Sequence, residues 1–344
     1  MAGTIEAVRI VTTEATPHDD ASFIELQGAG TTGWFGPVSA DIGHYVGKVL
    51  ADVAIGQSPD DHHRLHAALC DATAGDTTAV ASWAVGVVDC AAWDLHGQIV
   101  QKPVAQLLAA SPRWAVPLYA SWLSLDISLP TPVAALRQVG RGGWRFTKWG
   151  LRKGVENDPG IEADRLAAKI RSVAAALGEA AAFDAVFTWD ATLAEFVADQ
   201  VDPANLLWLE DPLRNYDLEA YGSLAGKTPL GVGERLLIHA DGQTLLSLQL
   251  RAFTLDVVAC GGLTRAADLV IAAHARGISA YPHGRSFVPA VHLAAAYPHA
   301  IAAVEYRLQW EPVRQQKYAR PWLPAHGVIT VPKSPGLGAT PRRH

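Results

Sequence analysis

The sequence predicts an α/β protein: a (β/α)₈-type TIM barrel with an α+β N-terminal capping domain that the C-terminal segment completes. Three observations support this prediction. A β-like pattern gives way to helical periodicity in the first part of the chain, short apolar runs then alternate with helix-like stretches, and several of these runs end in an ionisable residue. The expected boundaries are 1–112 for the cap, 113–310 for the barrel and 311–344 for a segment that packs back on the cap.

The composition excludes several classes of protein. With 344 residues, 49% of them hydrophobic and 18% charged, the chain can bury a large core and is not intrinsically disordered. Its net charge of −6 argues against a nucleic-acid partner. No apolar stretch is long enough for a membrane span and the first residues lack a secretory-signal pattern, so we expect a cytoplasmic protein with no membrane partner. Three scattered cysteines, Cys70, Cys90 and Cys260, are expected to be buried thiols.

The capping domain begins with a β-like pattern from Ile5 to about Gly36. A polar break at 17–20 divides this pattern into two apolar runs, which predicts antiparallel strands. Helical periodicity follows at 41–50 and 60–69, and a long helix is predicted from Thr77 to about Val100. A sheet followed by helices indicates an α+β cap.

The barrel is predicted from a strand–helix rhythm that begins at Val116. The apolar runs are 116–121, 144–150, 185–190, 206–211, 229–234, 252–258, 277–283 and 302–306. The clearest helices are expected at 161–177, 192–200, 218–224, 264–276 and 288–296. A further β-like run, 328–332, lies in the C-terminal segment. This many units in a row fits a closed barrel better than an open sheet.

Ionisable residues stand at the ends of the predicted barrel strands, and from the second one on they follow at intervals of 20 to 27 residues. They are Lys148, Asp190, Glu210, Glu234, Asp256, His283 and Glu305. An interval of that size is about one βα unit of a ~250-residue barrel. The side chains are therefore expected at the C-terminal mouth, where barrel enzymes keep their active sites.

Three of these residues predict a metal site. Asp190, Glu210 and Glu234 would converge from adjacent strands, and three carboxylates repel one another unless a cation lies between them. Oxygen-only ligands favour Mg²⁺, with Mn²⁺ as an alternative, over zinc. The competing interpretation is that some of them cap helices or pair with nearby arginines.

The remaining residues predict an acid/base group. Asp256 and His283 end neighbouring strands, so the carboxylate could fix the tautomer of the imidazole and raise its basicity. Lys148 is expected across the mouth, where it would pair with a substrate carboxylate or act as an acid/base. A structural alternative makes Lys148 a partner of Asp190 or Glu210.

Taken in order, the motifs resemble those of the enolase superfamily, in its mandelate racemase/muconate lactonizing enzyme subgroup. They are GWFGP (33–37), VVDCAAWDLHGQIVQKPVAQLL (87–108), LYAS (118–121), TWDAT (188–192), WLEDP (208–212), GVGE (231–234), LDVVACGGLT (255–264), YPHG (281–284) and VEY (304–306). The resemblance implies that Asp190, Glu210 and Glu234 bind Mg²⁺ and that Asp256 and His283 form a catalytic dyad. It further implies a homo-oligomer, between a dimer and an octamer, and a catalytic Glu305 that hydrogen-bonds the substrate carboxylate. Arg285, Trp149 and Tyr119 are candidate substrate-binding residues.

Three departures from the family pattern bear on the functional prediction. A second lysine is usual after the second barrel strand, and Gly150 stands in its place. The loop around PHDDAS (17–22) is short, and Thr192 stands where asparagine is usual. With one certain acid/base, dehydration of a sugar acid to a 2-keto-3-deoxy acid is favoured. The alternatives are a racemase or epimerase that uses Lys148 as second base, a cycloisomerase or other lyase of the subgroup, and a carboxylate-binding barrel without turnover.

Overall fold

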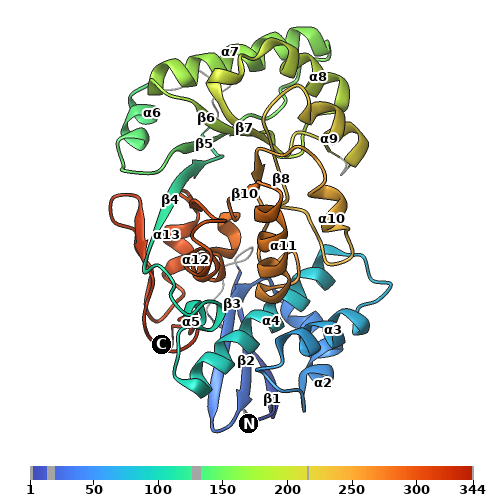
Figure 1. The fold of residues 1–344 in the computed structure, drawn as a ribbon, viewed down its shortest axis with the longest axis vertical. Coiled ribbons are helices and arrows are strands. Elements are labelled where there is room, and N and C mark those ends of the chain that lie inside the picture. Colours follow the sequence, from blue (N-terminus) through green and yellow to red (C-terminus); the bar gives the residue numbers. More distant parts are fainter. Residues whose placement is uncertain (1–2, 14–19, 126–132, 215–216, 343–344) are drawn as a thin grey trace.

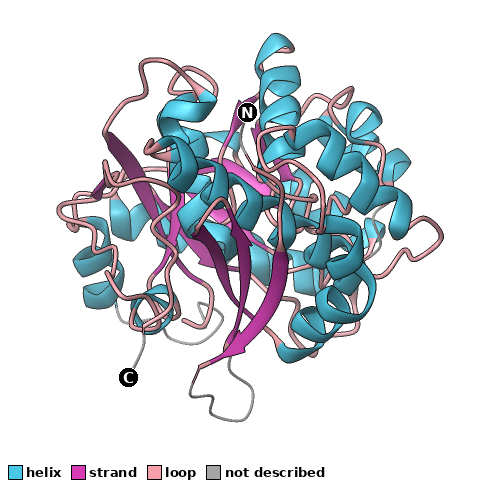
Figure 2. Ribbon diagram, turned by 90° about the horizontal axis from the view of Figure 1, so that it is seen from below, coloured by secondary structure: helices cyan, strands magenta, loops and turns pink. Residues whose placement is uncertain are grey.

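The computed structural model describes residues 3–13, 20–125, 133–214 and 217–342. Most of the short loop near residue 20 that the sequence singles out, residues 14–19, lies outside them. Figure 1 shows the cap, in blue, at one end of the molecule and the helices that follow the second and third barrel strands at the other. The helices surround the barrel strands on their outer side (Figure 2).

The cap is a three-stranded antiparallel sheet covered by helices. The strands are β1 (Ala7–Thr12), β2 (Ser22–Gly28) and β3 (Thr31–Val38), followed by α1 (Ala40–Tyr45), η1 (Val46–Leu50), α2 (Ala51–Ala54), α3 (His62–Ala72), α4 (Ala79–Val100) and α5 (Val104–Leu108). The second predicted apolar run is two strands rather than one, because Ala29 and Gly30 both have positive φ and form a tight hairpin turn.

Eight parallel strands form the barrel in the spatial order β10-β9-β8-β7-β6-β5-β4-β11. They are β4 (Ala115–Trp122), β5 (Thr147–Gly150), β6 (Ala181–Asp184), β7 (Leu206–Glu210), β8 (Leu230–Val232), β9 (Ala252–Phe253), β10 (Ser279–Ala280) and β11 (Val304–Arg307). The edges meet where Glu305 N donates to Pro282 O at 3.2 Å and Ala280 N donates to Ala300 O at 2.9 Å. The predicted fold class, a capped α/β barrel, is confirmed.

Helices follow most of the barrel strands. The segments are α6 (Val133–Gly140), α7 (Pro159–Leu177), α8 (Ala191–Gln200), η2 (Pro203–Asn205), α9 (Leu218–Ala225), α10 (Gly242–Leu245), α11 (Leu263–Ala275), η3 (Gly284–Ser286), α12 (Phe287–Ala296), α13 (Glu311–Gln315) and the strand β12 (Val328–Thr330). Asp158 and Asp217 cap α7 and α9 by accepting hydrogen bonds from backbone N–H groups of the first turn. No helix in the described part of the chain is long and apolar enough to cross a membrane.

The third barrel strand lies earlier in the chain than the sequence predicts. The predicted run 185–190 is a turn, and the strand is the preceding four residues, Ala181–Asp184. Val186 and Phe187 have φ values of 53° and 55°, which no strand residue adopts. Their apolar character imitates a strand, but both belong to the loop that leads to α8.

The cap is joined to the barrel by direct helix contact and to the C-terminal segment by hydrogen bonds. A Cβ on Gly86 of α4 would lie 2.0 Å from the carbonyl oxygen of Val258, so only glycine permits this approach. The Tyr318 hydroxyl donates to Gly36 O at 2.7 Å, and Gln98 Nε2 donates to Pro335 O at 3.0 Å. These contacts hold the cap over one side of the barrel.

His292 gives the fold an acid-sensitive contact. It is buried in α12, where Nδ1 accepts from Ala105 N at 3.1 Å and Nε2 lies 3.1 Å from the carbonyl oxygen of Leu337. The Nδ1 contact requires the neutral ring, because a protonated Nδ1 cannot accept a hydrogen bond, and burial lowers the pKa of His292 to about 4. Because the pKa is depressed on folding, this stabilisation is present above the unfolded value of about 6.5 and is lost as the pH falls toward 4.

We expect His292→Gln to weaken the pH dependence of stability between pH 6.5 and 4. The difference between the unfolded and folded pKa of His292 corresponds to a change of about 3 kcal/mol at most in the free energy of unfolding. Urea unfolding at pH 7.5, 6 and 4.5 measures the free energy of unfolding, and the difference between wild type and variant should shrink as the pH falls. His299→Gln, at an exposed histidine, should keep the wild-type pH dependence. A constant difference across these pH values would contradict the assignment.

Candidate active site

A buried lysine lies at the centre of the barrel mouth. Lys148 is the second residue of β5, and its side chain is fully buried inside the barrel. Its Nζ is 2.6 Å from Glu210 Oε1, 3.0 Å from Glu305 Oε1 and 3.3 Å from Asp184 Oδ2. Burial alone would lower the lysine pKa, but these carboxylates outweigh it and hold the pKa well above its usual range. Lys148 is therefore a fixed cation, and the predicted pairing with Glu210 is what the structure shows.

Three carboxylates from consecutive strands form a cluster. Asp184, Glu210 and Glu234 each offer an oxygen, and these oxygens lie within 4.8 Å of one another. Asp184 and Glu210 end β6 and β7, and Glu234 follows β8, so the parallel register of the sheet brings them together. Trp208 Nε1 donates to Glu210 Oε2 at 2.8 Å and fixes that side chain. The cluster could bind Mg²⁺ through oxygen ligands.

Asp190 is not part of the cluster, which corrects its assignment as a metal ligand. It is exposed at the start of α8, where its side chain accepts a hydrogen bond from Leu193 N at 2.9 Å. This is the helix-capping role of the competing interpretation. The cause is the misplaced strand: Asp184–Ala185 and Asp190–Ala191 are both Asp–Ala pairs, and only the first ends a strand. The departure at Thr192, on α8, therefore lies away from the site as well.

The electrostatics of the cluster fit a divalent cation. Burial, together with the charges of Asp184 and Glu305 and opposed by Lys148, raises the pKa of Glu210 to about 8. Asp211, next in the chain, is fully buried, and neither carboxyl oxygen has a hydrogen-bond partner among the described residues. Burial and the neighbouring carboxylates raise its pKa well above the usual range. A cation between these groups would relieve their mutual repulsion, as hard oxygen-ligated cations do.

The predicted Asp256–His283 pair is present. His283 Nδ1 lies 3.0 Å from Asp256 Oδ2, and Asp256 Oδ1 accepts from Val258 N at 3.0 Å and Ala259 N at 2.9 Å. Despite burial, hydrogen bonds from His283 and the backbone lower the pKa of Asp256, so it accepts from Nδ1 as a carboxylate. The other ring nitrogen, Nε2, is left to face the mouth.

His283 Nε2 lies between two carboxylates, 3.8 Å from Glu234 Oε1 and 3.6 Å from Glu305 Oε2. Burial would lower the histidine pKa, but Glu234, Glu305 and Asp256 outweigh it and raise the pKa to about 9. Glu305 Oε2 also accepts from Gly284 N at 2.8 Å. Burial would raise the pKa of Glu305, yet Lys148 and His283 hold it at about 2. In this arrangement Glu305 is ionised and accepts hydrogen bonds rather than donating them.

Two of the three candidate substrate-binding residues lie away from the mouth. Trp149 is fully buried on the outer side of β5, because side chains alternate along a strand and Lys148 points inward. Tyr119 lies deeper in the barrel, with its ring centroid 6.0 Å from Lys148 Nζ and 4.6 Å from the Phe146 ring. Both assignments are corrected: Trp149 belongs to the core and Tyr119 to an aromatic floor below the site. Arg285 follows His283 at the rim and is partly exposed.

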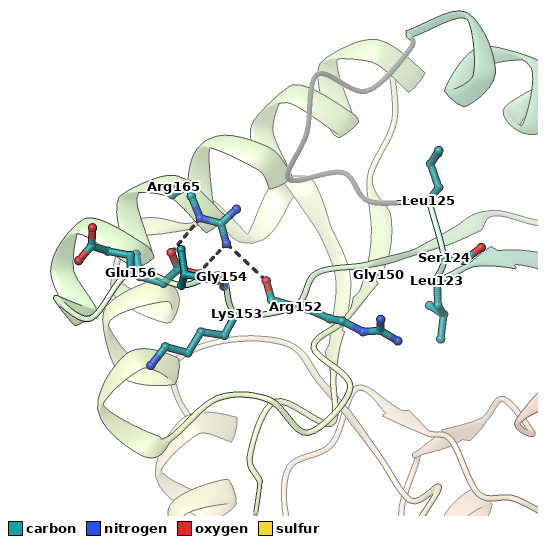
Figure 3. A pocket seen from close by; sticks show the side chains of 11 residues that line it. Leu123, Ser124, Leu125, Gly150, Arg152, Lys153, Gly154, Glu156 and Arg165 are labelled. Carbon is teal, nitrogen blue, oxygen red and sulfur yellow. Dashed lines mark hydrogen bonds and ion pairs between the residues drawn. The ribbon is translucent and has the colours of Figure 1, made fainter.

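Gly150 leaves no room for a second lysine. A Cβ at this position would lie 2.6 Å from the carbonyl oxygen of Leu123 and 3.1 Å from its Cα, both backbone atoms. A cavity of about 520 Å³ opens beside it, and its lining includes Gly150, Lys153 and Arg165 (Figure 3). Lys153 extends away from Gly150 in this view, and Arg165 pairs with Glu162 at 2.6 Å. At the position of the usual second lysine the wall is therefore backbone, and the basic side chains of Arg152 and Lys153 line the cavity beside it.

The fold and the site together define a class: capped barrels that carry a carboxylate cluster and an Asp–His pair at the C-terminal mouth. Residues 21–109 match the family model described as "Mandelate racemase / muconate lactonizing enzyme, N-terminal domain". Residues 133–344 match the model described as "Enolase C-terminal domain-like". The chain belongs to the mandelate racemase/muconate lactonizing enzyme subgroup of the enolase superfamily, which confirms the resemblance in the sequence.

Solved structures share this fold over nearly the whole chain. A mandelate racemase/muconate lactonizing protein from Paracoccus denitrificans PD1222, complexed with magnesium, is 23% identical, with a TM-score of 0.83 and coverage of 99% of this chain and 96% of that one. A 3,6-anhydro-D-galactonate cycloisomerase from Zobellia galactanivorans is 21% identical, with a TM-score of 0.79 and coverage of 98% and 96%. A racemase from Streptomyces coelicolor A3(2) with bound magnesium is 24% identical, with a TM-score of 0.75 and coverage of 97% and 96%.

Removing a cluster carboxylate should weaken magnesium binding. We expect Asp184→Asn to raise the Kd for Mg²⁺ by at least about tenfold, since even residues that only support a metal ligand contribute that much. Asp190→Asn is the matched control, because it removes one negative charge six residues away and asparagine also caps helices. Isothermal titration calorimetry with Mg²⁺ and Mn²⁺ measures both variants. If Asp190→Asn weakened Mg²⁺ binding and Asp184→Asn left it unchanged, Asp190 and not Asp184 would be the metal ligand.

Proposed function

We propose that this protein removes the proton α to a carboxylate and then eliminates water, converting a sugar acid to a 2-keto-3-deoxy acid. The observation that carries the proposal is the asymmetry of the mouth. His283 Nε2 is a proton-transfer atom on one side, whereas the opposite side has Gly150 and its close backbone contact with Leu123. An elimination needs only one such group, provided that the proton and the leaving hydroxyl lie on the same face.

Each side chain has a distinct task in this reaction. The base is the neutral form of His283: a cation held by Glu234 would offset the carboxylate charge that raises the histidine pKa, so that Nε2 can take the α-proton. The resulting imidazolium returns a proton to the departing hydroxyl, water leaves and the neutral histidine is regenerated. The enol that remains becomes the 2-keto-3-deoxy acid when its hydroxyl proton is replaced by a proton on C3. Asp256 holds the ring and stabilises its protonated form through Nδ1. Lys148 contributes fixed positive charge where the substrate carboxylate becomes more negative. Mg²⁺ bound by Asp184, Glu210 and Glu234 would add Lewis-acid stabilisation of that same charge.

The racemase and epimerase alternative requires a second base, and Lys148 is the residue that the sequence offers. Its Nζ is fully buried and contacts three carboxylates, which favour its protonated form. Proton transfer from that position would have to break these ion pairs, and a buried charge left without its partner is costly. The geometry therefore supports elimination over inversion of configuration.

The reaction is tested by proton NMR in D₂O with Mg²⁺ and pooled four- to six-carbon acid sugars. Dehydration predicts the signal of a 3-deoxy methylene group. Exchange of the α-proton without that signal would contradict dehydration and favour the racemase or epimerase alternative. Binding without exchange or elimination would favour the non-catalytic carboxylate-binding barrel.

His283→Asn tests the acid/base role. We expect turnover to fall at least about 10²-fold, the lower range for loss of general acid–base catalysis. The Kd for Mg²⁺ should stay close to the wild-type value, because the carboxylate cluster is intact. His299→Asn, at an exposed histidine, is the matched control and should keep full activity. Wild-type turnover in His283→Asn would overturn the assignment.

A further inference from the structure

A second cavity of about 420 Å³ opens at the mouth, between the end of β11, the cap and the C-terminal segment. Four of its lining side chains are basic and one is acidic: Arg285, Arg307, Arg314 and Lys317, with Asp20. The reaction proposed above uses none of them. The cavity is therefore a charged compartment that the mechanism leaves unexplained.

The positive charge in this cavity exceeds the negative charge that the described residues supply. Arg314 lies 3.2 Å from Asp20 Oδ2 and also donates to Pro37 O at 2.7 Å, so it ties the C-terminal segment to the cap. Arg285 is 3.9 Å from the same carboxylate. Glu311 is buried and lies 4.0 Å from Arg307. Lys317 Nζ donates to the carbonyl oxygen of Asp20, and Arg314 holds the Asp20 carboxylate. Arg285 and Arg307 are therefore the cations with the weaker ion pairs, at 3.9 and 4.0 Å.

Polar groups in the cavity wall also lack partners. Arg307 Nε and both amide atoms of Gln309 are buried without a hydrogen bond to any described residue. Buried donors left unsatisfied are costly, and they point to a water or ligand that completes them. Arg285 keeps its guanidinium in place by stacking over the Trp83 ring, 4.3 Å from the centroid.

The cavity lies one layer outward from the catalytic pair. Arg307 follows Glu305 by two residues on β11, so both side chains are on the same face with about 7 Å between their Cα atoms. Arg285 follows His283 by two residues. The stem of Arg307 packs on Gly284, where a Cβ would lie 2.9 Å from Arg307 Cγ. A chain whose α-carbon meets His283 can extend along this layer into the cavity.

We propose that this cavity binds a second anionic group, at the end of the substrate distal to the reacting carboxylate. Arg307 and Arg285 are its binding residues, and Gln309 donates the remaining hydrogen bond. Guanidinium groups present paired N–H donors that match carboxylate and phosphate oxygens. The inference rests on the proposed function only in placing the reacting carboxylate at the cluster. The distal group is a carboxylate or a phosphate, and binding measurements distinguish the two.

The test measures binding of unreactive probes by calorimetry on the Mg²⁺-loaded protein, so it does not depend on turnover. The probes are butyrate, glutarate and inorganic phosphate. A distal carboxylate site predicts that glutarate binds at least tenfold more tightly than butyrate. A distal phosphate site predicts that inorganic phosphate binds while glutarate gains nothing over butyrate.

The variants assign the site. In Arg307→Gln the advantage of glutarate, or the binding of phosphate, should fall at least tenfold, while butyrate binding stays within twofold. Arg307→Lys keeps the charge but loses the paired donors, so it should retain only part of the advantage of glutarate or of the binding of phosphate. Arg285→Gln should act in the same direction, and because Arg285 is partly exposed, its loss does not threaten the fold. Arg171→Gln, at an exposed arginine of α7, is the control.

Two results would overturn the inference. One is equal binding of butyrate and glutarate together with no binding of phosphate. The other is a preference that survives in both Arg307→Gln and Arg285→Gln. Neither result bears on dehydration, which the methylene signal tests separately; equally, a failed dehydration assay leaves the binding measurements unaffected.

Discussion

The mouth of the barrel depends on one buried cation. Lys148 contacts carboxylates of three other strands, β6, β7 and β11, so a single ammonium group holds together side chains that would otherwise repel one another. Its burial is tolerable only because these partners surround it, as a lone buried charge would be very costly. The same arrangement determines where negative charge is concentrated. The carboxylate cluster lies on one side of Lys148, and Glu305, which also contacts His283, lies on the other.

The geometry of the strands explains how the carboxylates that contact Lys148 are positioned. The partners of Lys148 belong to strands one or two positions from β5 in one sheet, and the parallel register brings their ends to one level. Below this level, the rings of Tyr119, Phe146, Trp208 and Tyr281 fill the barrel and exclude water from beneath the ammonium group. A dry floor strengthens the ion pairs above it, because the local dielectric constant is low.

The sequence predicts most of this centre because strand ends are readable from it. Lys148, Glu210, Glu234, Asp256, His283 and Glu305 all follow apolar runs, and all of them lie at the mouth. Asp184 is not predicted from the sequence because its strand is only four residues long and rich in alanine. Val186 and Phe187, which follow it, are apolar like strand residues but have positive φ. The assignments of Trp149 and Tyr119 are wrong for another reason. Which side chains of a strand point into the barrel, and how deep they lie, depends on the register between neighbouring strands, which cannot be derived from one sequence. The cavity around Arg307 is also hidden, since the cap, the loop after β10 and the C-terminal segment all contribute to its lining.

The two sides of the mouth are built differently, and this difference constrains the chemistry more than any single residue. On one side, His283 is fixed by Asp256, which is itself held by two backbone N–H groups and by the Ser286 hydroxyl. On the other side, the backbone of Leu123 lies so close to Gly150 that it occupies the space a second basic side chain would need. A proton removed by His283 can return only from the same side unless another group enters. Returning it to a leaving hydroxyl completes an elimination, whereas returning it to carbon restores the substrate. The proposed reaction therefore requires a leaving group on the face of His283, and in that proposal the β-hydroxyl of the substrate is as essential as its α-proton.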